Sequence, residues 1–171
     1  MPRLFSGKVI FYFLLLFVLD GTVLPGIQVN GAYPSFLCLL ICYSAFEWGG
    51  QKTVYVAFWA GLLRDLLSPG PLGFEAGLCV LLAYALSFTV QKIEREFPGI
   101  YFLITFLYLL IVGVLRLLCS GFEGLPEAVS WSAVGGIALT ALYSAAFLPL
   151  FYSITDGWMG KSHAKQYELF R

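Results

Sequence analysis

The chain has 171 residues, of which 60% are hydrophobic, 18% aromatic and only 12% charged. A soluble domain carries about 25% charged residues, so this chain has too few charges to cover the surface of a water-soluble enzyme. A disordered chain needs low hydrophobicity and high net charge, and is excluded as well. Ten basic and ten acidic residues balance to a net charge of zero, which leaves no basic surface for nucleic acid. The composition predicts an all-α integral membrane protein with room for about six spans.

The chain consists of apolar segments separated by short polar turns. We expect one transmembrane domain over residues 1–171, with six helices near residues 9–24, 33–46, 53–67, 71–90, 99–119 and 129–154. The last three segments have the length of about 20 residues that a spanning helix needs. The first three are shorter and must tilt, use turn residues or thin the bilayer. The third segment either crosses fully or turns within the bilayer. The short connections predict a compact six-helix bundle.

The basic residues give the orientation. With the N-terminus inside, eight of the ten basic residues lie on the cytoplasmic side: Arg3, Lys8, Lys52, Lys92, Arg95, Lys161, Lys165 and Arg171. Because cytoplasmic loops carry the excess of Lys and Arg, both termini are predicted to be cytoplasmic. The first segment has no small-x-small cleavage site between Asp20 and Leu24. We therefore expect it to be an uncleaved anchor.

The cysteines and the histidine do not form a metal-binding pattern. Cys38, Cys42, Cys79 and Cys119 all lie inside apolar segments, and His163 lies in the polar tail. No CxxC pair is present. Buried thiols behave as small hydrophobic groups, so no metal and no cofactor is predicted.

The pair Arg64-Asp65 is the first candidate functional feature, because a charge within a membrane segment is costly. Asp65 ends the third helix, where an acid is unfavourable, and it needs a partner. That partner is either the backbone N–H groups of the following turn or Arg116. Arg64 is expected to extend toward the outer headgroups. Pro71 suits a first helical position, and Glu75 then lies in the first turn, where the helix dipole favours an acid.

The residues around this pair resemble a known signature. The run from Ala60 to Gly73 reads AGLLRDLLSPGPLG. It is similar to the signature of the bacterial rod shape-determining protein MreD family, in which a glycine and leucines precede an aspartate, then Leu-Leu, a turn and Pro-Leu-Gly. The residues that carry this resemblance are Gly61, Asp65, Pro71 and Gly73. Tyr33-Pro34-Ser35 resembles the family's Arg-Pro-Asp before the second span, and only Pro34 carries over.

The resemblance implies a function and a fold. It implies a non-enzymatic scaffold of the cell-elongation machinery in the bacterial inner membrane, with MreC as its direct partner. Through MreC it implies indirect links to the MreB filament, to RodA and to the transpeptidase partner of RodA, and so to peptidoglycan synthesis. The family is also similar in fold to the substrate-binding subunits of energy-coupling-factor transporters.

The sixth segment carries a ridge of small residues. Ser132, Gly136, Thr140 and Ser144 follow one another at steps of four. Such a ridge lets another helix approach closely, and hydroxyl groups can bond across the gap. The other helix belongs either to this bundle or to a partner. Gly73 and Gly77 form a shorter ridge on the fourth segment.

Two alternatives compete with a scaffold. An enzyme needs positioned acids, bases or nucleophiles. Apart from Arg64, which is expected to reach the headgroups, the membrane segments hold only Asp20, Asp65, Glu75 and Arg116 and lack histidine. The other alternative is a small-molecule (vitamin) binding subunit of a membrane transporter. Such subunits typically carry Ala-x-x-x-Ala in the first span, and residues 9–19 contain no alanine. A vitamin site also requires several convergent polar groups, so the sequence favours a scaffold without enzymatic activity.

Overall fold

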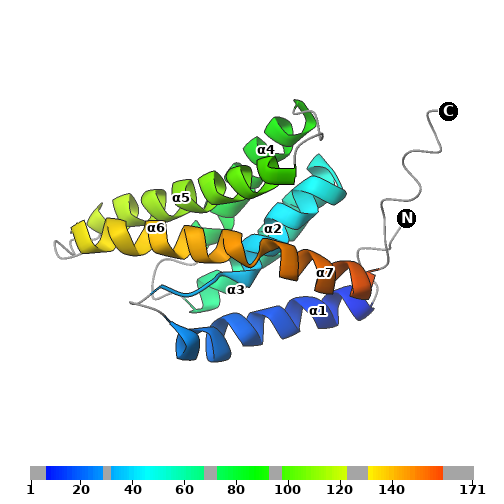
Figure 1. Cartoon of the computed structure of the whole chain (residues 1–171), viewed down its shortest axis with the longest axis horizontal. Coiled ribbons are helices and arrows are strands. Elements are labelled where there is room, and N and C mark those ends of the chain that lie inside the picture. Colours follow the sequence, from blue (N-terminus) through cyan, green and yellow to red (C-terminus); the bar gives the residue numbers. More distant parts are fainter. Residues whose placement is uncertain (1–6, 29–31, 68–72, 93–97, 123–130, 160–171) are drawn as a thin grey trace.

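The computed structural model describes residues 7–28, 32–67, 73–92, 98–122 and 131–159. In these residues the chain is helical almost throughout (Figure 1). The helices are α1 (Gly7–Val18), α2 (Phe36–Glu47), α3 (Gly50–Leu67), α4 (Phe74–Lys92), α5 (Pro98–Phe122), α6 (Trp131–Ala146) and α7 (Leu148–Met159). Two short turns continue α1, the π-helical η1 (Leu19–Val23) and the 3₁₀-helical η2 (Leu24–Ile27).

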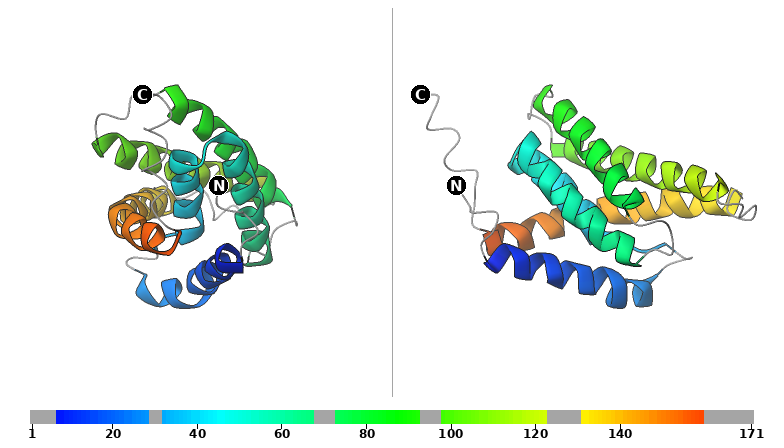
Figure 2. Two further views of the ribbon diagram at one scale, coloured as in Figure 1. Left: turned by 90° about the vertical axis from the view of Figure 1, so that its right-hand side faces the viewer. Right: turned by 180° about the vertical axis from the view of Figure 1, so that it is seen from behind.

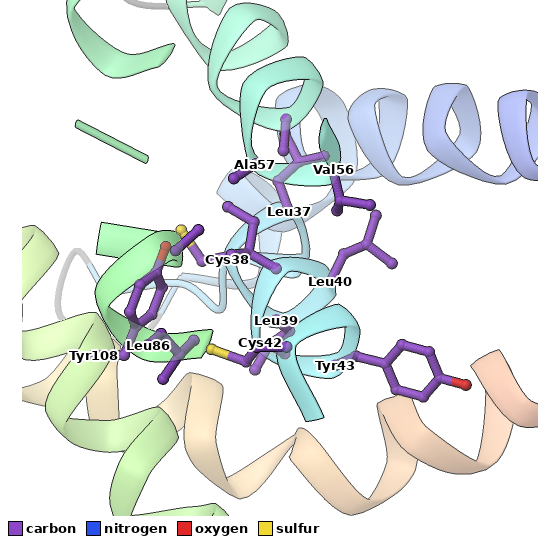
Figure 3. Close-up of a cluster of buried hydrophobic side chains, with 14 of the residues drawn as sticks. Leu37, Cys38, Leu39, Leu40, Cys42, Tyr43, Val56, Ala57, Leu86 and Tyr108 are labelled. Carbon is purple, nitrogen blue, oxygen red and sulfur yellow. The ribbon is translucent and has the colours of Figure 1, made fainter. Parts of the chain in front are cut away.

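Helix α2 forms the centre of the molecule. Ten of its twelve residues are buried, and Figure 2 shows the other helices arranged around it. A helix that is apolar on every side is stable only when it is covered on every side. Figure 3 shows Leu37 and Leu40 near Val56 of α3, and Cys42 on the side of Tyr108 of α5. The core therefore surrounds α2.

Helices α3 and α4 make the most extensive contact between any two helices in the described residues. A Cβ atom at Gly61 would lie 2.5 Å from the Cα atom of Ala76, so the two backbones touch at this point. Near the other end of the pair, a Cβ atom at Gly50 would lie 3.9 Å from the Cβ atom of Ser87. The two helices thus run side by side over most of their length.

The sixth predicted span is a bent pair of helices rather than one straight helix. Helices α6 and α7 meet at Phe147 with a bend of 44°. Pro149 explains the bend, because it has no backbone N–H and its ring clashes with the carbonyl group four residues earlier, at Ala145. At the bend the N–H of Phe147 is shared between the carbonyl groups of Tyr143 and Ser144.

Only some of the described helices are both long and apolar enough to cross a membrane. These are α4, the part of α5 from Gly99 to Leu118, and the α6–α7 pair if it counts as one span. The shorter apolar helices cover Phe11–Val23 and Phe36–Glu47. Helix α3 begins at Gly50, before the predicted residue 53, and carries three charged residues. The structure thus provides two or three candidate spans by length and composition.

The first and last described helices lie together. Figure 1 shows α1 beginning and α7 ending on the same side of the molecule. The hydroxyl groups of Tyr12 in α1 and Thr155 in α7 form a buried hydrogen bond of 2.7 Å. This bond joins two helices whose bonded residues are 143 positions apart in the sequence.

Candidate functional site: a buried polar cluster

Asp65, in the last turn of α3, binds the N-terminus of α4. Its carboxylate accepts hydrogen bonds from the N–H groups of Gly73 and Glu75, both at 2.9 Å, and of Ala76 at 3.2 Å. The first N–H groups of a helix have no partner within the helix, and the helix dipole favours an anion there. Backbone N–H groups are thus the partner of Asp65, one of the two predicted possibilities. Gly73 has φ +94°, a conformation that favours glycine.

Asp20, in η1, plays the same role for α2. Its carboxylate accepts a hydrogen bond from the N–H of Phe36 at 2.8 Å and one from the Ser35 hydroxyl at 3.3 Å. Asp20 is buried, and so is Ser35 at the start of α2. Two aspartates, each near the end of a helix, therefore stabilise the N-terminus of the following helix along the chain.

Ser35 also connects α2 to α6. Its backbone N–H donates to the hydroxyl oxygen of Ser144 at 3.2 Å, and the Ser144 hydroxyl donates to the carbonyl group of Thr140 at 2.7 Å. Ser144 is buried in the last turn of α6, just before the bend. The start of α2 is therefore bound to η1 and to α6.

Arg64 lies against the interior of the bundle. Its Nη1 donates to the Sγ atom of Cys38 in α2 at 2.6 Å. Glu75 and Asp20 attract its charge over a longer range than an ion pair. The expectation that Arg64 extends to the outer headgroups is wrong, because its guanidinium group is directed inward to Cys38 of α2.

Glu75 and Arg116 form an ion pair between α4 and α5. The Arg116 Nε atom donates to Glu75 Oε1 and joins α5 to the first turn of α4. The Glu75 side chain is buried and the Arg116 side chain is about one-third exposed. Arg116 is therefore the partner of Glu75 and not of Asp65. In the described residues the second oxygen of Glu75, Oε2, has no hydrogen-bond partner.

We call this set the polar cluster: Asp20, Arg64, Asp65, Glu75 and Arg116. It places three carboxylates and two guanidinium groups on four helical segments around α2. Removing one member of a buried charge pair typically costs about 3–5 kcal/mol, because the remaining charge loses its partner. The cluster thus fixes the relative positions of η1, α2, α3, α4 and α5. Within the described residues, no group of three or more His, Cys, Asp or Glu side chains could hold a metal ion.

A comparison with protein families identifies the family of this chain. The sequence profile described as rod shape-determining protein MreD matches residues 1–156. The chain belongs to the MreD family. No curated protein matches the chain, and no solved structure matches it. Membership in the MreD family implies a role in rod shape determination, and the apolar helices fit a membrane protein.

The residues of the MreD signature lie at the α3–α4 contact. Gly61 faces the backbone of Ala76, and Asp65, one turn later, reaches the start of α4. Gly73 forms the turn before α4, so it does not belong to a helical ridge with Gly77. Pro71 lies outside the described residues. Pro34, which precedes the start of α2, is buried.

The small-residue ridge of α6 has mixed surroundings. Ser144 is buried and bound to Ser35, whereas a Cβ atom at Gly136 would meet no atom within 4 Å. Thr140 is partly buried, and the side chain of Ser132 lies outside the described residues. Helix α5 contacts α6 at another position, where Gly113 faces the Ile137 side chain. A partner-binding role for the ridge stays a prediction.

The sequence analysis missed the role of Asp20. A signal was available, because both aspartates precede a Pro-Gly pair, at Pro25-Gly26 and at Pro69-Gly70. It also missed the contact between α2 and α7, in which the Tyr43 hydroxyl donates to Asp156 Oδ1 at 2.7 Å. No local pattern links residues 113 positions apart.

Proposed function

We propose that this chain is a non-enzymatic scaffold of the cell-elongation machinery, and that it binds MreC. One observation carries the proposal: the buried carboxylates bind helix ends within the chain. Asp20 and Asp65 each accept backbone N–H groups of a following helix, and Glu75 pairs with Arg116. Charges used in this way give a rigid bundle, which suits a protein that acts by assembly.

The proposed location is the bacterial cytoplasmic membrane, with six spans over residues 1–171 and both termini cytoplasmic. Two features of the structure support it. Lys52 lies near the start of α3 and Lys92 at the end of α4, and these helix ends are adjacent because Gly50 lies beside Ser87. The polar cluster lies near the opposite ends of the same helices. This distribution agrees with a cytoplasmic excess of Lys.

The proposed partners follow from membership in the MreD family. We expect MreC to bind directly, and MreB, RodA and the transpeptidase partner of RodA to associate through it. The scaffold then couples cytoplasmic filaments to peptidoglycan synthesis. The exposed surface of α1 disfavours the alternative, a vitamin-binding transporter subunit. That surface consists of large side chains at Phe11, Leu14, Leu15 and Val18, whereas the transporter subunits use small residues there.

Co-purification from native membranes tests the proposal. The chain, tagged at its C-terminus and solubilised in a mild detergent, should recover MreC in an amount comparable to its own. An unrelated multi-pass protein with the same tag controls for non-specific recovery. Recovery of an ATP-binding transport module in place of MreC would overturn the scaffold function in favour of the transporter subunit.

A further inference from the structure

Two buried polar atoms in the interior of the bundle have unused hydrogen-bonding capacity. The Glu75 Oε2 atom in α4 and the Tyr108 hydroxyl in α5 have no hydrogen-bond partner among the described residues. Each of the two residues is only 5% exposed. Nearly all buried polar groups in native proteins are paired, either with protein atoms or with ordered water. These two atoms therefore need partners that the described part of the chain does not supply.

Arg64 has the complementary property, a surplus of donors. Its guanidinium group carries five N–H donors, and among the described residues its hydrogen-bond acceptor is the Sγ atom of Cys38, a weak acceptor. Glu75 attracts the Arg64 charge, but the ion pair of Glu75 is with Arg116. Donors of Arg64 and an acceptor of Glu75 thus lie within electrostatic range of each other without a direct bond.

These three polar groups face one region beside α2. Arg64 lies within electrostatic range of Cys38 and Cys79. Tyr108 lies within range of the same two thiols, and Figure 3 shows its hydroxyl group on the side of Cys38. Cys79 follows Glu75 by one turn, on the same face of α4. The polar groups, which come from α3, α4 and α5, therefore converge around the two cysteines.

We propose that Arg64, Glu75 and Tyr108 form a site inside the bundle that binds water. We call these three residues the hydrated site. Water bridges the remaining N–H groups of Arg64 to Glu75 Oε2 and pairs with the Tyr108 hydroxyl. A buried water molecule makes about three hydrogen bonds to polar groups, and the three residues supply both donors and acceptors. Polar groups that are too far apart for a direct hydrogen bond are commonly bridged in this way.

The charges and the packing favour water over other ligands. A cation would lie near the Arg64 guanidinium group and an anion near the Glu75 carboxylate, so either ion would meet a like charge. A neutral molecule that both donates and accepts avoids this repulsion. A vitamin-sized ligand needs a cavity of about 300 Å³ or more, whereas Cys38 and Cys79 are at most 1% exposed between packed helices. Water meets both conditions.

Radiolytic labelling of the full-length protein in detergent tests the hydrated site. An X-ray pulse converts water into hydroxyl radicals, which oxidise side chains close to that water, and mass spectrometry locates the products. Tyr108 is compared with Tyr12, which is similarly buried but whose hydroxyl is bound to Thr155. We expect Tyr108 to be oxidised about threefold faster than Tyr12, or more, because bound water lies beside it. Equal rates would overturn the proposal.

The variant Tyr108→Phe tests whether the hydroxyl is paired. In a dry interior this variant removes an unpaired polar group and should raise the melting temperature. In the hydrated site it removes a hydrogen bond, so we expect the melting temperature to fall by about 2–4 °C. Tyr12→Phe removes a direct hydrogen bond and calibrates the size of such a loss. Tyr84→Phe, at an exposed position of α4, should leave the melting temperature unchanged.

Two further outcomes would overturn the hydrated site. One is a higher melting temperature of Tyr108→Phe than of the parent protein. The other is a bound organic molecule that native mass spectrometry detects in the parent protein and not in Tyr108→Phe, because that molecule would then be the occupant. The measurements do not involve MreC, so their result is independent of the co-purification that tests the proposed function.

Discussion

At the scale of single residues, Gly61 and Asp65 depend on each other. They are four positions apart in a helix, so they lie on the same face of α3. Gly61 allows the backbones of α3 and α4 to touch. Only at that separation does the short Asp65 side chain reach the N–H groups of Glu75 and Ala76. The glycine and the aspartate of the signature thus form one structural unit.

A series of Gly→Ala variants tests this dependence. Gly61→Ala places a methyl group against the backbone of Ala76, which cannot rotate away, so we expect a loss of stability of about 3 kcal/mol. Gly113→Ala meets only the Ile137 side chain, which can change rotamer, and should cost about 1 kcal/mol. Gly77→Ala is the control, because its Cβ atom would meet nothing within 4 Å. Unfolding in detergent should rank the variants in this order, and equal stability of Gly61→Ala and Gly77→Ala would contradict it.

At the scale of the elements, α7 is held separately from α6. The bend at Phe147 interrupts the helix, so the position of α7 depends on its own contacts. The Tyr43 hydroxyl donates to Asp156 and Tyr12 bonds to Thr155. The ring of Tyr43 also packs edge-on against Tyr152, with centroids 4.8 Å apart. These contacts join the last described helix to the central helix α2 and to α1.

Removal of one hydroxyl should loosen α7 without affecting the rest of the bundle. Tyr43→Phe leaves the Asp156 carboxylate without this donor. We expect backbone amides of α7 to exchange hydrogen about tenfold faster, measured by mass spectrometry in detergent. Tyr84→Phe is the matched control, because Tyr84 lies exposed on α4. Unchanged exchange in α7, or faster exchange of equal size in every helix, would show that this hydrogen bond does not position α7.

At the scale of the whole molecule, the arginines of the polar cluster and the exposed Lys92 have different surroundings. The arginines of the polar cluster are bound to partners inside the bundle. Lys92 is exposed at the end of α4, where it lies over the ring of Phe88 at 4.1 Å. A solvated Lys orients a membrane protein more strongly than a charge compensated within the fold, because the free charge resists translocation.

Labelling of introduced cysteines tests the proposed orientation. Gln28 follows η2 and Gln51 is the second residue of α3, and both are exposed. In a Cys119→Ser background the other three cysteines are buried. A membrane-impermeant maleimide should label Gln28→Cys in intact spheroplasts, and Gln51→Cys only after permeabilisation. Labelling of both residues from the same side would contradict the six-span arrangement.

The sequence predicted those features that depend on local chemistry. An acid at the end of α3 needs a partner, and a turn rich in Gly and Pro provides N–H groups, so the backbone partner of Asp65 was one of two predicted possibilities, and no local pattern excluded the other, Arg116. Arg64 was misplaced because its partner Cys38 is 26 positions away and is an uncommon acceptor. The bend between α6 and α7 was missed although Pro149 indicated it. The burial of ten of the twelve residues of α2 depends on helices that come before and after it, and no local pattern contains that information.

The burial of α2 has a consequence for how the protein is made. Twelve helical residues extend about 18 Å, which is short of the hydrocarbon thickness of about 30 Å. A nascent helix of this length is too short to span the hydrocarbon, so its transfer from the translocon into lipid on its own is unfavourable. Helices α3 and α4, which cover α2, are synthesised after it. We therefore expect α2 to remain beside the translocon until α3 and α4 have been synthesised. The three helices then enter the bilayer together.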